Sequence, residues 1–158
     1  MLKRFIERVR RNHGLEHATI TLMLANQGPM RVVGRSDHSG FWVYARVDTQ
    51  RLRAYVEEAL ARLKGGEEHL AISPMCGTNI AVAGILAGAG SFIAMSTSDR
   101  RDGLPRAIVA SLLGVVASQP VGRLVQKYAT TSGKAAGLSV LSVERISPNV
   151  HKVRTAQA

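Results

Sequence analysis

Two histidines and a glutamate near the start of the chain have the types and spacing of a metal site. His13-Gly-Leu-Glu16-His17 is a His-x-x-Glu-His motif, the inverted form of the His-Glu-x-x-His zinc motif. On a helix, residues four apart lie on one face, so both imidazoles can bind one ion. Glu16 could then act as the general base that takes a proton from a water molecule at the metal. The alternative is an ordinary polar helix start with Asn12 as its N-cap.

A third protein ligand is needed, because catalytic zinc sites have three protein ligands and one open position. Cys76 is the favoured third ligand, since Pro74-Met-Cys-Gly-Thr78 is typical of a tight turn and an apolar stretch follows it. The alternative for this single cysteine is a small buried thiol. A thiolate with two imidazoles suits zinc best, so zinc is the expected cofactor. Other candidate ligands are His69, Glu67 and Glu68, the last two expected as surface charges, and His38 and His151, expected to be solvated.

Two apolar stretches follow the turn. Residues 69–98 contain no Lys, Arg, Asp or Glu. Within them, residues 78–97 are long enough, at about 1.5 Å per residue, to span a bilayer core of roughly 30 Å. After a charged loop, residues 107–122 form a second uncharged stretch, which Pro120 is expected to kink or end. We expect a transmembrane hairpin; the alternative is two buried helices of a soluble domain.

The formal net charge of +10 indicates an anionic partner. Basic chains bind nucleic acid or anionic lipid headgroups, but aromatic residues make up only 4% of the chain and do not interleave with the cations. Membrane lipid is therefore the expected partner, and nucleic acid is not. The basic residues 1–11 are expected to form a solvated helix or a headgroup anchor. Gly84 and Gly88 form a Gly-x-x-x-Gly pair that would allow a second copy or another membrane protein to pack closely.

The distribution of charge also predicts an orientation. Of the 21 Lys and Arg residues, only three lie in the loop between the two apolar stretches, and the flanking segments carry the remaining 18. By the positive-inside rule, both termini are expected in the cytoplasm, with the protein in the inner membrane of a bacterium.

The remaining segments indicate a small α/β layer. Residues 30–34 and 41–47 are strand candidates, and residues 36–40 between them have hairpin-turn composition. Asp48 or Thr49 is expected to cap a helix that ends at Gly65-Gly66. The apolar positions of this helix repeat at helical spacing: Leu52, Val56, Leu60 and Leu63.

These elements predict an α+β fold. It combines a helical membrane hairpin of two transmembrane helices with a small cytoplasmic α/β layer and an N-terminal helix that carries the His-x-x-Glu-His motif. Residues 138–146 are expected to form a late strand, and the tail after Pro148 is expected to fray. The expected domains are residues 1–77, the hairpin at residues 78–128, and a C-terminal strand and tail at residues 129–158.

Three blocks of the sequence resemble those of a known family. They are His13-Gly-Leu-Glu-His-Ala-Thr-Ile20, Ser73-Pro-Met-Cys-Gly-Thr-Asn79 and Val125-Gln-Lys-Tyr-Ala-Thr-Thr131. In kind and order they are similar to blocks of the YqhQ-like family of metal-dependent bacterial membrane enzymes, and most similar to a sister family with an Asn-His-Gly-Leu-Glu-His-Ala-Thr-Ile motif. The resemblance implies metal binding by His13, His17 and Cys76. The chain departs from the family at Ser73, where the family has a histidine, and in a longer segment between the first two blocks.

The favoured function is a membrane-embedded zinc-dependent hydrolase, with a peptidase as the expected type. Its metal would lie on His13, His17 and Cys76, and Glu16 would be the general base. Thr78 and Asn79 are candidates for orienting ligands or stabilising an oxyanion. The alternative is a non-catalytic metal-binding membrane protein that acts as a scaffold or subunit of a larger membrane complex.

Overall fold

The computed structural model of the chain describes residues 1–97 and 102–157. The expected charged loop between the two apolar stretches therefore lies partly outside the described residues, which exclude Asp99, Arg100 and Arg101. The chain forms two compact units. One unit combines Met1–Ser73 with Lys127–Ala158, and the other is Pro74–Gln126.

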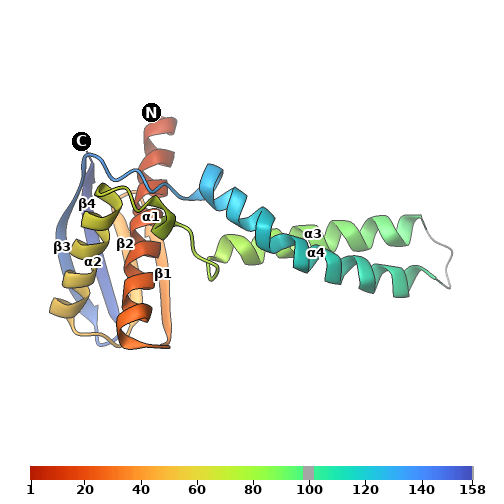
Figure 1. The fold of residues 1–158 in the computed structure, drawn as a ribbon, viewed down its shortest axis with the longest axis horizontal. Helices are drawn as coiled ribbons and strands as arrows, with labels where there is room; N and C mark the ends of the chain where they lie inside the picture. Colours follow the sequence, from red (N-terminus) through yellow and green to blue (C-terminus); the bar gives the residue numbers. More distant parts are fainter. Residues whose placement is uncertain (98–101, 158) are drawn as a thin grey trace. The chain divides into compact units, whose positions relative to one another are not determined.

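The first unit is a four-stranded antiparallel sheet covered on one face by two helices (Figure 1). The strand order is β1-β2-β4-β3, and the helices are α1 and α2. Side chains alternate along each strand, so Phe41, Val43 and Ala45 of β2 face the helices and are buried, whereas Tyr44 is exposed. The bounds are β1 Val32–Asp37, β2 Gly40–Ala45, β3 Leu138–Ser147, β4 Val150–Gln157, α1 Leu2–Gln27 and α2 Thr49–Lys64.

Helix α2 confirms the sequence prediction at both ends. The Asp48 side chain accepts hydrogen bonds from the backbone N–H groups of Gln50 and Arg51, which the first turn of a helix leaves without partners. Gly65 follows the last helical residue. Leu52, Val56 and Leu63 are buried in the core, as their spacing predicts.

Helix α1 is longer than a helix capped at Asn12 would be, and the N-cap alternative is wrong. Asn12 lies in the middle of the helix and is completely buried. Its side-chain amide donates to the backbone carbonyl of Asp37 at 2.8 Å and accepts from Thr155 at 2.7 Å. Asn12 therefore ties α1 to both β1 and β4.

The C-terminal tail does not fray, contrary to the expectation from sequence. Residues 150–157 form β4, which pairs with β2 on one side and β3 on the other. His151, expected to be solvated, is completely buried on this strand, with Nε2 3.2 Å from the Thr49 hydroxyl. Strand β3 confirms the predicted late strand at residues 138–146.

A partly buried ion pair joins Asp37, at the end of β1, to Lys152 of β4. Lys152 is 3% exposed, and its Nζ donates to the carboxylate of Asp37 at 2.6 Å. Burial alone would raise the pKa of Asp37, but hydrogen bonds from Lys152 and Ser39 outweigh it and hold the pKa of that carboxyl well below its usual range. The ammonium also lies 4.8 Å from the centre of the Trp42 ring. The turn is therefore tied to β4 by charge.

The second unit is a helical hairpin of α3, Gly77–Ser96, and α4, Gly103–Val125. Pro120 does not end α4, contrary to one expectation, and a π-helical turn at Gln126–Thr130 (η2) follows the helix. Small residues allow the two helices to approach closely: a Cβ at Gly114 would lie 2.7 Å from the backbone nitrogen of Ala87. Ser91 and Ser111 are hydrogen-bonded across the pair.

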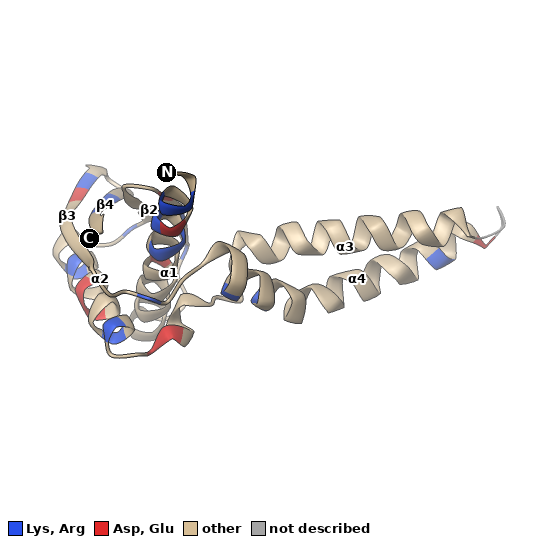
Figure 2. Ribbon diagram, turned by 90° about the horizontal axis from the view of Figure 1, so that it is seen from above, with Lys and Arg blue, Asp and Glu red and all other residues tan. Residues whose placement is uncertain are grey.

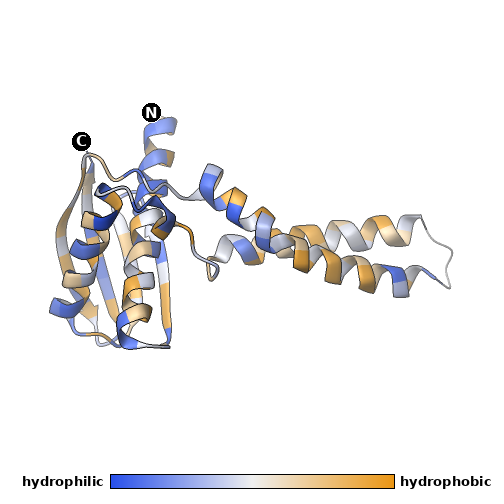
Figure 3. Ribbon diagram, viewed as in Figure 1, coloured by the Kyte–Doolittle hydropathy of each residue, from blue (hydrophilic) through white to orange (hydrophobic). Residues whose placement is uncertain are grey.

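Both hairpin helices are long and apolar enough to cross a membrane. Figure 2 shows few charged residues along them, and Figure 3 shows hydrophobic bands that alternate with residues of intermediate hydropathy. Their large apolar side chains point outward, including Ile85, Phe92, Leu112 and Val116. The open space around Gly84 and Gly88, where an added Cβ would meet no atom within 4 Å, means that neither glycine is used in packing α3 on α4.

Candidate metal centre

The two histidines of the motif lie on α1 with their rings in contact. The ring centroids of His13 and His17 are 4.4 Å apart, as expected for residues one helical turn apart. His17 is 4% exposed. Each Nδ1 atom lies at hydrogen-bond distance from a backbone carbonyl oxygen: 2.9 Å from Thr130 for His13, and 2.8 Å from Ala71 for His17.

These carbonyl contacts decide which ring nitrogen can bind a metal. A carbonyl oxygen only accepts hydrogen bonds, so in each neutral ring the proton is on Nδ1 and the lone pair is on Nε2. Metal-binding histidines commonly donate their second N–H to a carbonyl or carboxylate, which fixes both the tautomer and the ring orientation. His13 and His17 therefore both present Nε2 as the metal-binding atom.

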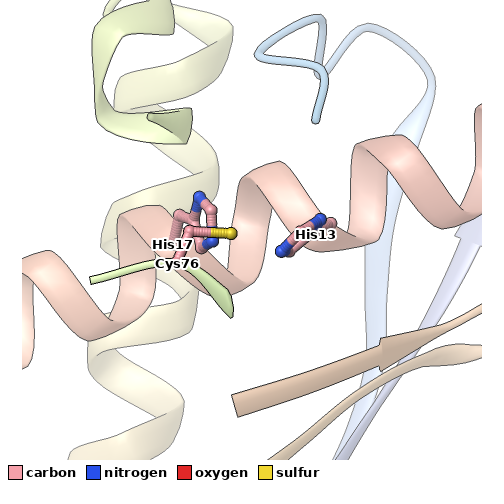
Figure 4. Close-up of side chains that lie close together, drawn as sticks. All are labelled: His13, His17 and Cys76. Carbon is pink, nitrogen blue, oxygen red and sulfur yellow. The ribbon is translucent and has the colours of Figure 1, made fainter. Parts of the chain in front are cut away.

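Cys76 completes a group with these two histidines. It is the N-cap of α3, where its sulfur accepts a hydrogen bond from the backbone N–H of Thr78 at 3.4 Å. The ligand atoms of His13, His17 and Cys76 all lie within 4.8 Å of one another (Figure 4). In a tetrahedral zinc site the ligand atoms are about 3.3–3.7 Å apart. The group could hold a metal ion after its atoms close by roughly an ångström.

Glu16 lies on the side of α1 that faces the sheet. It is 5% exposed, and the Ser36 hydroxyl donates a hydrogen bond to its carboxylate. A Cβ at Gly34 would collide with this carboxylate, so Glu16 packs directly on the backbone of β1 at a residue without a side chain. Glu16 is not one of the three residues whose ligand atoms gather. The structure thus places it beside the histidines in sequence but against β1 in space.

The glycine of the motif has a packing role. The chain from Thr131 to Gly133 crosses α1 here: the backbone N–H of Ser132 donates to the carbonyl of Arg10, and Arg10 Nη2 donates to the carbonyl of Thr131. A Cβ at Gly14 would collide with the Ser132 carbonyl. Gly14 therefore lets the chain pass close enough for the neighbouring Thr130 carbonyl to reach His13.

The comparisons with known proteins place this chain in a family. A model of a domain of unknown function, DUF6391, matches residues 8–143. The chain belongs to the DUF6391 family. It is also similar to an uncharacterized protein of the cyanobacterium Picosynechococcus sp., with 32% identity over 138 residues, 78% of this chain and 66% of the relative. The chain thus spans slightly less than two thirds of that relative's length. No solved structure matches.

The part of the chain matched by the DUF6391 model contains all three sequence blocks, and hydrogen bonds connect them. The Thr130 carbonyl of the third block accepts from His13 of the first. The Gln126 side chain, also of the third block, donates to Asn79 Oδ1 of the second at 2.9 Å, and both residues are buried. Asn79 Nδ2 donates to the Pro74 carbonyl at 2.8 Å. These hydrogen bonds give Asn79 a role in closing the base of the hairpin of this DUF6391 protein.

The other candidate ligands of the DUF6391 chain do not lie close enough to His13 and His17 to share a metal ion with them. Within the described residues, His13, His17 and Cys76 are the one group of three or more potential ligands close enough to share an ion. Glu67 pairs with Arg62 at 3.8 Å, and Glu68 and His69 are exposed. His38 is exposed, as predicted, and stacks on Phe5.

Sequence reasoning missed the groups that orient the site. Two of them, the carbonyls of Ala71 and Thr130, belong to the backbone and have no signature in residue type. The turn-like composition of residues 36–40 predicts Ser36 in a turn, whereas β1 continues through it to Asp37. The spacing of Gly34 and Ser36 could have indicated that both residues face the same neighbour, because alternate residues of a strand share one face.

Proposed function

We propose that this protein is a zinc-dependent hydrolase of the membrane, with His13, His17 and Cys76 as metal ligands, Glu16 as general base and a peptide as substrate. The observation that carries the proposal is the pair of Nδ1–carbonyl hydrogen bonds. Two histidines that lie one helical turn apart, each presenting Nε2 as the electron-pair donor, provide two oriented metal ligands.

The donor set fits zinc. Two imidazole nitrogens and one sulfur are ligands of the borderline-soft kind that zinc prefers. Cys76 lies at a helix N-terminus, where the backbone N–H groups favour a negatively charged ligand. Three protein ligands would leave a fourth position open, the usual arrangement of catalytic zinc sites.

In the proposed reaction, zinc supplies Lewis acidity that polarises the scissile carbonyl and activates water. Glu16 takes one proton from the attacking water, and the water oxygen forms a bond to the carbonyl carbon. The carbon–nitrogen bond then breaks, and Glu16 returns the proton to the leaving nitrogen. Ser36, which donates to the Glu16 carboxylate, keeps its side chain oriented during both transfers.

The membrane setting is part of the proposal. The outward-pointing apolar side chains of α3 and α4 match lipid better than water. We infer that both termini are cytoplasmic, from the positive-inside rule. The resemblance to the YqhQ-like family supports a metal-dependent membrane enzyme, and the hydrogen bonds that join its three blocks agree with a shared site.

Metal analysis of detergent-purified protein tests the ligands. We expect about one zinc per chain in the wild type and almost none in His13→Ala/His17→Ala. Cys76→Ser should bind zinc more weakly, and His38→Ala/His69→Ala, which changes two exposed histidines, should keep it. Equal zinc content in the wild type and the His13→Ala/His17→Ala protein would exclude the site.

A second function, a metal-binding subunit without catalysis, is favoured by the position of Glu16. Its carboxylate packs against Gly34 and accepts from Ser36, as a purely structural carboxylate would. Glu16→Gln separates the two functions. For a general base, zinc content should be kept while cleavage of a quenched fluorescent peptide library falls by about 10²–10⁴-fold. Cleavage that does not change in Glu16→Gln would exclude Glu16 as the base, whereas no cleavage by the zinc-loaded wild type would favour the non-catalytic function.

A further inference from the structure

A groove of about 650 Å³ lies along the segments that orient the two histidines. Ala71, whose carbonyl accepts from His17, lines this groove. Thr131 also lines it and directly follows Thr130, whose carbonyl accepts from His13. A molecule bound in the groove would therefore lie against the backbone that fixes both histidines.

Three cationic side chains from separate segments line the groove. Arg10 comes from α1, Lys127 from η2 and Lys134 from the loop before β3. Neither lysine takes part in an ion pair within the part of the chain that the structure describes. The ammonium of Lys127 lies 5.5 Å from the ring centre of Tyr128, which also lines the groove.

The carboxylates in the groove do not cancel this charge. Glu7 accepts from Arg10 and from Arg11, each at 3.2 Å, so two cations already balance it. Glu68 is the one other carboxylate among the lining residues. The Nε of Arg10 is buried with no hydrogen-bond partner, so its guanidinium keeps unused donor capacity. The groove therefore keeps an excess of positive charge, carried mainly by Lys127 and Lys134.

We propose that this groove binds a carboxylate of the substrate, so that acidic peptides are the preferred substrate class. That the substrate is a peptide rests on the proposed function. That the preferred peptides are acidic rests on the charge of the groove. Lys127 and Lys134 would pair with the carboxylate as point charges on flexible stems. A carboxylate held against the segments that orient the two histidines would help to fix the position of the peptide relative to the site.

Binding of two matched peptides tests the proposal. Ala-Glu-Ala-Ala-amide with rhodamine on its N-terminal amine and the matching Gln peptide differ by one carboxylate, and their binding to the zinc-loaded protein can be measured by fluorescence anisotropy. We expect the Glu peptide to bind about tenfold more tightly than the Gln peptide, as for one additional charge-assisted contact. Lys127→Gln/Lys134→Gln should remove this preference without loss of zinc.

The control changes two exposed lysines that do not line the groove, in Lys3→Gln/Lys64→Gln, and should keep the preference. Equal binding of the two peptides by the wild type, or an unchanged preference in Lys127→Gln/Lys134→Gln, would overturn the proposal. Inorganic phosphate that competes as well as the Glu peptide would overturn the assignment to peptides. If the zinc-loaded wild type keeps the preference but cleaves neither peptide, the groove assignment stands and the proposed hydrolase fails.

Discussion

The two units of this chain place apolar side chains in opposite ways. In the α/β unit the largest apolar residues are inside, and Phe41, Leu15 and Leu52 are completely buried. In the hairpin, Gly114 and the Ser91–Ser111 pair lie between the helices, while Phe92 and Leu112 point outward. The first pattern is stabilised by removing apolar surface from water. The second leaves that surface exposed, in a hairpin whose two helices are long and apolar enough to cross a membrane.

The largest difference in unfolding free energy is expected between alanine substitutions of two phenylalanines, one in each unit. Phe41→Ala should lower the unfolding free energy of the α/β unit by about 3–5 kcal/mol, because it empties a fully packed position. Phe92→Ala, at a position 73% exposed, should leave that value unchanged. Denaturant titration followed by fluorescence of the single tryptophan, Trp42 on β2, measures the α/β unit directly. Equal losses in the two variants would contradict the division into two differently stabilised units.

Introducing a lysine at two equally exposed positions, one in each unit, tests the comparison further. Leu112 in α4 is 62% exposed and Val33 in β1 is 63% exposed. If lipid surrounds the hairpin, Leu112→Lys should cost about 2.5–3.5 kcal/mol of insertion free energy, whereas Val33→Lys faces water and should cost almost nothing. The fraction of protein that stays in membranes after an alkaline carbonate wash should fall for Leu112→Lys alone. Full membrane retention of Leu112→Lys would contradict a lipid-facing position.

The smallest effect is expected from acidification, and it should be confined to the α/β unit. Burial lowers the pKa of His151, the nearby Arg145 lowers it further, and Asp48 partly opposes them. The unfolded chain therefore binds a proton more readily than the folded one, so stability is full above about pH 6.5 and falls below it, by at most about 1.4 kcal/mol per pH unit. Helix α3 contains no ionisable side chain that could contribute.

The His151→Gln variant provides the control for this pH dependence. Gln does not titrate, so Trp42-detected unfolding should lose part of its slope between pH 7 and pH 5. A slope identical to that of the wild type would show that other groups account for the acid sensitivity.

Local sequence patterns predicted the elements that depend mainly on residues close to one another in the chain. The helix at Thr49–Lys64 follows from its cap residue and its apolar periodicity, and the two hairpin helices follow from the length and lack of charge of their sequences. The strand at Val150–Gln157 could not be predicted in the same way, since its pairing partners lie about 110 residues away in β2 as well as next to it in β3. Lys152 and His151 suggest an exposed tail by residue type, but an ion pair with Asp37 and packing against α2 bury them.

The same distinction applies to the candidate site. Spacing on one helix was sufficient to pair His13 with His17, and the turn at Pro74–Thr78 drew attention to Cys76. The orientation of the rings depends on two carbonyls supplied by distant segments, and the position of Glu16 depends on Gly34 in the next strand. Such contacts form only when distant segments pack together, so they cannot be predicted from residue types and spacing along the sequence.

The central position of β4 sets the order in which the molecule can be completed during synthesis. Strand β4 joins β2 to β3, so the sheet stays in two pieces until the ribosome has released the last residues of the described chain. The carbonyl that orients His13 is also made only after both hairpin helices. His13 would thus reach its metal-binding orientation only after the hairpin has been synthesised.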